Sequence, residues 1–245
     1  MPFTYETIDC QNPPNNANVR RIYRVVKAVF NNTAENAKDI RNKAWQLAMQ
    51  VNPHKANNAT DTRTKERLIL DAMGGVLSEL AWHDYINRFF GQDTVSFTPF
   101  NTATAQIDLL LKNGKTIEVR SSFPRNGIKF AICNERYNFK NICKYENLYK
   151  PSETDKDFFA CVLFETQKKD LMQVSNIILY LIGGSTKAMM QDDTIAFESD
   201  LIAEDDIAQK RTRYRVIRLK DALDMTGFIQ YMKNMGYNEK TKSRQ

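Results

Sequence analysis

The chain has 245 residues and a mass of 28.4 kDa, which is large for one domain and small for two, so we expect one large domain with an appended segment. With 42% hydrophobic and 26% charged residues, the composition is that of a globular protein and excludes collagen-like and wholly disordered classes. The net charge of +6 favours a polyanionic partner.

Cysteine and histidine usage limits the chemistry further. Four cysteines lie far apart without a Cys-x-x-Cys pair, which predicts reduced, mostly buried thiols. They are Cys10, Cys133, Cys143 and Cys161. With only His54 and His83, sites built from several convergent histidines are disfavoured.

No apolar stretch approaches the roughly 18 to 20 residues of a membrane span, and no basic start precedes an apolar run, so we expect a cytoplasmic protein.

The first part of the chain is expected to form an N-terminal helical arm. Residues 16–31 place apolar side chains at helical spacing with basic residues between them, which predicts a short basic amphipathic helix. A second helix is expected from about Thr33, a suitable N-cap, to Val51, followed by a polar linker. We therefore divide the chain into an arm, residues 1–60, and a main domain, residues 61–245.

A long helix is expected over residues 64–90, ended by Gly91. The Gly74-Gly75 pair inside it would either break the helix or let another part of the chain approach closely.

Strands dominate the remainder. Residues 94–97, 106–111 and 116–122 are expected to be strands, and Asn113-Gly114 predicts a hairpin between the last two. A mixed segment at 134–150 precedes two apolar runs, 157–164 and 176–182, which are typical of buried strands. A strand at 214–219 and a helix at 220–235 complete an α/β or α+β domain, with a mixed β-sheet flanked by helices.

Three carboxylates stand where this pattern calls for apolar residues. Glu79 projects from the centre of the apolar stripe of the 64–90 helix. Asp108 and Glu118 occupy the two strands of the expected hairpin, which can bring both to one face of the sheet. Because like charges at short range repel, a divalent cation is the simplest way to keep both ionised, and oxygen ligands favour Mg²⁺ or Mn²⁺. A solvated sheet face is the alternative interpretation of the hairpin pair alone.

These residues resemble the PD-(D/E)XK nuclease superfamily. Gln-Ile-Asp108 on one strand, Glu118-Val-Arg120 on the next and Glu79 on the upstream helix carry the likeness, which extends from about Lys65 to Ile182. The resemblance implies a restriction-endonuclease-like fold and a Mg²⁺-dependent endonuclease that cleaves double-stranded DNA, similar to a type II restriction enzyme. By the same analogy it implies sequence-specific cleavage by a homodimer. Asp108 and Glu118 would bind the metal, with Glu79 as a further ligand or an orienting group.

Arg120 occupies the place of the family's usual lysine. Because arginine stays protonated, it would position the attacking water or stabilise charge at the phosphate, or it marks a loss of activity. It could equally form a structural ion pair with Glu118 or Glu79. A non-catalytic nucleic-acid-binding protein of the same fold and a DNA repair or RNA-processing nuclease are therefore the alternative functions.

Two basic segments are expected to contact the nucleic acid. The first follows the strand at 116–122 and would lie beside the scissile phosphate; its residues are Ser121, Ser122, Arg125, Asn126 and Lys129. The second contains three arginines, Arg211, Arg213 and Arg215, which share one face if the segment is extended. The alternative for the second segment is an edge strand kept soluble by its charge.

Overall fold

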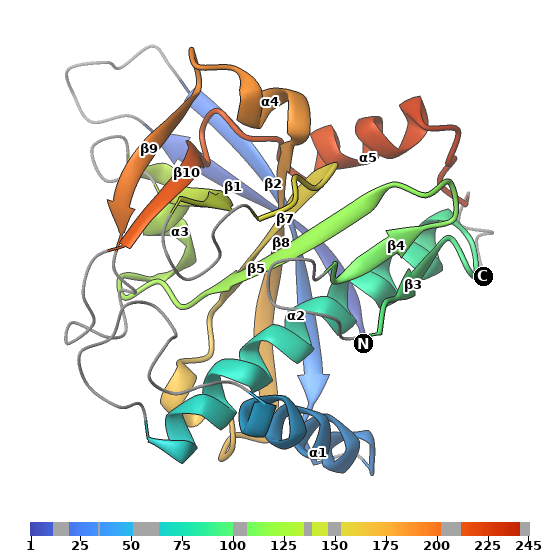
Figure 1. The fold of residues 1–245 in the computed structure, drawn as a ribbon, viewed down its shortest axis with the longest axis vertical. Helices are drawn as coiled ribbons and strands as arrows, with labels where there is room; N and C mark the ends of the chain where they lie inside the picture. The colour runs from blue at the N-terminus through green and yellow to red at the C-terminus, as the bar shows by residue number, and fades with distance from the viewer. Residues whose placement is uncertain are drawn as a thin grey trace.

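The computed structural model describes residues 1–11, 20–33, 35–50, 64–99, 107–134, 139–146, 153–201 and 212–240. It has a mixed α+β architecture, in which a mostly antiparallel seven-stranded sheet is flanked by helices and accompanied by a smaller three-stranded sheet (Figure 1). None of the helices in these ranges is both long and apolar enough to cross a membrane.

The large sheet has the strand order β1-β2-β8-β7-β5-β4-β3. Its neighbouring strands are antiparallel except β5 and β7, which run parallel. The strands are β1 (Phe3–Gln11), β2 (Arg20–Asn31), β3 (Val95–Phe97), β4 (Leu109–Leu111), β5 (Thr116–Ser122), β7 (Phe158–Phe164) and β8 (Asn176–Thr186). The small sheet has the order β6-β10-β9 and consists of β6 (Lys140–Tyr145), β9 (Ala196–Leu201) and β10 (Thr212–Arg218).

Helices cover both faces of the large sheet. The helical segments are α1 (Glu35–Gln50), α2 (Lys65–Phe90), α3 (Gly127–Cys133), α4 (Lys187–Gln191), α5 (Met225–Asn234) and a short 3₁₀ helix, η3 (Lys168–Asp170). The main core joins α2 and α5 to one sheet face through Trp82, Phe158 and Phe228. Alternate residues of β7 and β8 point to the opposite face, where α3 packs through Ile128 and Ile132.

The structure contradicts the helix expected over residues 16–31. Residues 20–31 form β2, which pairs with both β1 and β8, and residues 16–19 lie outside the described ranges. Both faces of this strand are covered: Val25 belongs to the α3-side core, whereas Val26 belongs to the α2-side core. A strand buried on both faces carries apolar residues at odd and even positions alike, and here their spacing resembled that of an amphipathic helix. The helix expected from Thr33 is present as α1.

The Gly74-Gly75 pair does not break α2, which is continuous through it. A Cβ atom added at Gly74 would lie 3.1 Å from Cζ of Phe123, whereas one added at Gly75 would meet nothing within 4 Å. Gly74 therefore permits the close approach of the segment that follows β5, which was the second of the two interpretations left open.

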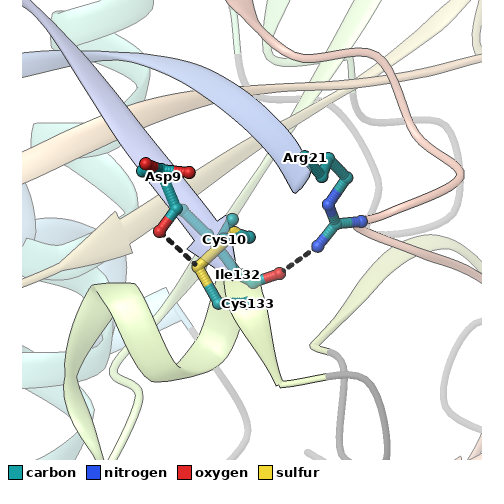
Figure 2. The surroundings of a disulfide bond; sticks show 5 residues. All are labelled: Asp9, Cys10, Arg21, Ile132 and Cys133. Carbon is teal, nitrogen blue, oxygen red and sulfur yellow. Dashed lines mark hydrogen bonds between the residues drawn. A yellow bond between two sulfur atoms is a disulfide. The ribbon is translucent and has the colours of Figure 1, made fainter. Parts of the chain in front are cut away.

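The prediction of four reduced thiols is wrong for two of them. Cys10 and Cys133 form a disulfide that connects β1 to the end of α3 (Figure 2). Cys143 and Cys161 are free and buried. Nearby, Nη2 of Arg21 donates a hydrogen bond to the carbonyl of Ile132 at 2.6 Å (Figure 2). The two cysteines are separated by 123 residues, so only the packing of α3 against the edge strand brings them together.

Candidate active site

The expected hairpin is present and brings Asp108 beside Glu118. Leu109 of β4 pairs with Ile117 of β5, and Gly114 in the turn has a φ of 83°, a conformation that favours glycine. Leu109 and Ile117 point into the α2-side core. Oδ2 of Asp108, the residue before β4, accepts a hydrogen bond from the backbone N–H of Val119 at 2.7 Å. This bond ties the Asp108 carboxylate to the strand that carries Glu118.

Glu79 on α2 interacts electrostatically with the hairpin carboxylates. Burial raises the pKa of Glu79 to about 7; Lys43 opposes this rise and Glu118 adds to it. Burial also raises the pKa of Asp108 well above its usual range, with further contributions from Glu118 and Glu79, whereas the Val119 N–H and Arg120 oppose the shift. The three carboxyl groups therefore act on one another, as a site that binds a cation or holds a proton requires.

Arg120 is held between two buried carboxylates. Its Nη1 lies 2.9 Å from Oε1 of Glu118, and its Nη2 lies 3.0 Å from Oε1 of Glu153. The guanidinium also lies over the ring of Tyr145, 4.7 Å from its centroid, and the backbone N–H of Tyr145 donates to Oε2 of Glu153 at 3.0 Å. Burial lowers the pKa of Arg120, but the surrounding carboxylates outweigh burial and raise it overall. Among the roles considered for Arg120, the structure shows the ion pair with Glu118.

The donor chemistry of Asp108 and Glu118 suits a hard cation, although the described residues form no closed metal cage. Within the described ranges, no group of three or more His, Cys, Asp or Glu side chains is arranged to hold a metal ion. Mg²⁺ commonly keeps several waters and takes only one or two carboxylates from the protein, together with substrate phosphates. Asp108 and Glu118 fit that open type of site.

The residues expected to flank the scissile phosphate lie where β5 ends and α3 begins. Ser121 lies close to α2, since its Oγ would be 3.8 Å from a Cβ atom at Gly74, and Ser122 ends the strand half-buried. Arg125, Asn126 and Lys129 are exposed around the start of α3. The segment therefore offers polar and basic groups at the carboxyl end of the strand that carries Glu118.

Arg213 and Arg215, the two described arginines of the second basic segment, are paired with acids. β10 is the central strand of the small sheet, so the alternative of an edge strand is wrong. Arg213 contacts Glu198 at 3.5 Å and Asp200 at 3.2 Å, and Arg215 pairs with Asp193. Arg211 lies outside the described residues.

Sequence analysis did not identify Lys43, Tyr145 or Glu153 as members of this site. Glu153 precedes β7 in an irregular segment and reaches Arg120 because β7 runs beside β5. No periodicity marks such a residue; the only signal was an arginine on a buried strand, which indicates that acidic side chains lie close to it.

Comparisons of the chain with protein-family models, with curated proteins and with solved structures find no match.

Proposed function

We propose that the protein is a Mg²⁺-dependent endonuclease that cleaves double-stranded DNA sequence-specifically and has a restriction-endonuclease-like fold. The observation that carries this proposal is the electrostatic coupling of Asp108 and Glu118 on one hairpin with Glu79 on the helix packed against it. The basic net charge of +6 supports a polyanionic substrate. A homodimer would present two such sites to a palindromic sequence through a shared two-fold axis.

In the proposed mechanism, Asp108 and Glu118 would hold the metal, and Glu79 would support them. A bound Mg²⁺ supplies charge stabilisation at the phosphate and lowers the pKa of water. The Val119 N–H orients Asp108, and Arg120 orients Glu118 through their ion pair. Glu79, with a pKa of about 7, is the carboxyl group that can exchange a proton near neutral pH. Hydrolysis forms a bond from water oxygen to phosphorus and breaks the bond from phosphorus to the leaving oxygen. The attacking water loses a proton to a basic group or to solvent, and the leaving oxygen takes one up from solvent.

One observation favours a second candidate, a non-catalytic nucleic-acid-binding protein. Both terminal nitrogens of Arg120 contact carboxylates, so this cation is committed to the protein in the described structure. A site with its cation neutralised in this way would stabilise less charge at a phosphate.

Digestion of phage DNA with Mg²⁺ distinguishes the candidates. Discrete bands that disappear with EDTA and with Asp108→Asn support the proposal. Binding of DNA in a gel-shift assay without any cleavage, in Mg²⁺ or Mn²⁺, overturns it in favour of the binding protein. Branched DNA and RNA tested beside the duplex separate a restriction enzyme from a repair or RNA-processing nuclease.

A further inference from the structure

The candidate active site carries more negative than positive charge. Glu118 and Glu153 both form ion pairs with Arg120, Asp108 acts on Arg120 electrostatically, and Glu79 acts on Asp108. A phosphodiester is itself an anion, so it would be repelled unless further positive charge reaches the site. A bound divalent cation neutralises part of this excess, and any basic side chain close to the carboxylates contributes to the rest.

Lys43, on α1, is such a side chain. Its ammonium lies 4.7 Å from the centroid of the Phe97 ring. Phe97 pairs with Leu109, the residue that follows Asp108, so the ring lies next to the hairpin. His83, one turn after Glu79 on α2, stacks on the same ring with centroids 4.2 Å apart. Phe97 therefore brings Lys43 to the place where α2 meets the hairpin.

The electrostatics agree with this placement. Lys43 is the basic group that opposes the rise in the pKa of Glu79, so its charge acts on that carboxyl group, which in turn acts on Asp108. Lys43 is also exposed to solvent, so its ammonium can exchange water for a ligand at little cost.

We propose that Lys43 binds a phosphate oxygen of the nucleic acid at the carboxylate site, so that α1 forms part of the substrate-binding surface. The proposal rests on the proposed function for the identity of the anion as a phosphodiester. It assigns to α1, expected from sequence to belong to a separate arm, a direct contact with the substrate. An ammonium beside the phosphate would stabilise the charge that develops as water attacks.

The test compares Lys43→Ala and Lys43→Arg with a matched control, Lys65→Ala. Lys65 is also exposed and also lies over an aromatic ring, 5.3 Å from the centroid of Trp45, whereas the pKa shift of Glu79 is explained by burial, Lys43 and Glu118. Duplex binding is measured by fluorescence anisotropy in Ca²⁺ at several salt concentrations, and the single-turnover cleavage rate is measured in Mg²⁺.

Lys43→Ala is expected to weaken binding, to make the slope of log affinity against log salt shallower by about 0.9, and to slow cleavage on the order of 100-fold. Lys43→Arg should keep most of the binding affinity and most of the cleavage rate, because the positive charge is retained. Lys65→Ala should behave as the wild type. A merely structural lysine would change the melting temperature without moving the salt slope.

The possible failures are distinguishable. If the wild type cleaves DNA and Lys43→Ala changes neither the cleavage rate nor the salt slope, the role of Lys43 is overturned and the proposed nuclease function is retained. If the wild type binds DNA without cleaving it, the proposed nuclease function is overturned. The salt slope of Lys43→Ala then still decides whether Lys43 contacts a phosphate. A wild type that neither binds nor cleaves nucleic acid overturns both.

Discussion

Nη2 of Arg120 lies 3.0 Å from Oε1 of Glu153, a residue 33 positions later in the chain that is the second carboxylate, beside Glu118, to contact this buried guanidinium. The side chains of Arg120 and Glu153 are 14% and 3% exposed, so neither charge is well solvated. Removing one partner of a buried pair leaves the other charge without compensation. The pair therefore offers a direct measure of how far Arg120 stabilises the fold.

Arg120→Ala is expected to lower the free energy of unfolding by about 3 to 5 kcal/mol. Urea denaturation measures this change, and a double-mutant cycle with Glu153→Gln isolates the coupling between the two residues. Arg213→Ala serves as the control, because its ion pairs with Glu198 and Asp200 are exposed, and it should leave the denaturation midpoint unchanged. Equal effects of the two substitutions would contradict the assignment of Arg120 to a buried ion pair.

Asp108→Asn and Glu118→Gln are expected to abolish cleavage while DNA binding is largely retained. These substitutions keep the shape of each side chain and remove the negative charge that a metal ion requires. Single-turnover rates in Mg²⁺, compared with affinities in Ca²⁺, separate the two effects. Wild-type turnover in either variant would remove that residue from the proposed metal site.

The stability of the metal-free protein is expected to fall as pH rises toward 7. Burial raises the pKa of Glu79 from 4.5 to about 7, so the folded state binds this proton more tightly than the unfolded state does. The stabilising effect is complete below pH 4.5 and is lost as pH rises through 7; it amounts to on the order of 3 kcal/mol. Glu79→Gln removes this contribution and leaves the one from Asp108, whose pKa is also raised.

The measurement is the free energy of unfolding in EDTA, for the wild type and for Glu79→Gln, from pH 4.5 to pH 8. The free energy of unfolding of Glu79→Gln should increase relative to that of the wild type as pH rises. Parallel curves for the two proteins would show that Glu79 does not titrate in this range.

Gly74 and Gly75 form a matched pair on one helix. Gly75→Ala should stabilise the protein by about 1 kcal/mol, because alanine favours the helix and its methyl group meets nothing within 4 Å. At Gly74 the methyl group would lie 3.1 Å from Cζ of Phe123, whose ring stacks on Phe164 at 4.5 Å and has little room to move. Gly74→Ala should therefore gain nothing or lose stability. Thermal denaturation of both variants tests the difference, and equal gains would contradict the close approach of Phe123.

The Cys10–Cys133 disulfide should contribute about 5 kcal/mol by restricting the unfolded chain, since it closes a loop of 123 residues. Adding dithiothreitol is expected to lower the melting temperature of the wild type and to leave that of Cys10→Ser unchanged. Intact mass after alkylation reports whether two or four thiols react. Four reactive thiols in the non-reduced, denatured protein would show that the bond is not formed.

Local signals predicted the elements around the site well. The β4–β5 hairpin follows from Asn113-Gly114 and from alternation in its strands, and α2 begins where Thr64 accepts a hydrogen bond from the N–H of Arg67. Each of these features depends on residues close together in the chain. The amino-acid pattern alone therefore predicts that Asp108 lies beside Glu118.

Features that depend on distant packing could not be predicted in the same way. β2 was mistaken for a helix because the two faces of the large sheet are covered by different helices, a fact that no short window of sequence contains. Glu153 reaches Arg120 only through the parallel pairing of β5 with β7. Lys43 acts on Glu79 only because α1 packs on α2.

The disulfide also determines what a break in the backbone would do. Lys43, Glu79, Asp108, Glu118 and Arg120 all lie between Cys10 and Cys133, inside one covalent ring. A protease that cuts a single peptide bond within this ring leaves one molecule, heavier by one water, which separates into two fragments only when a thiol reductant is added. The candidate active site can therefore stay covalently whole in a nicked chain.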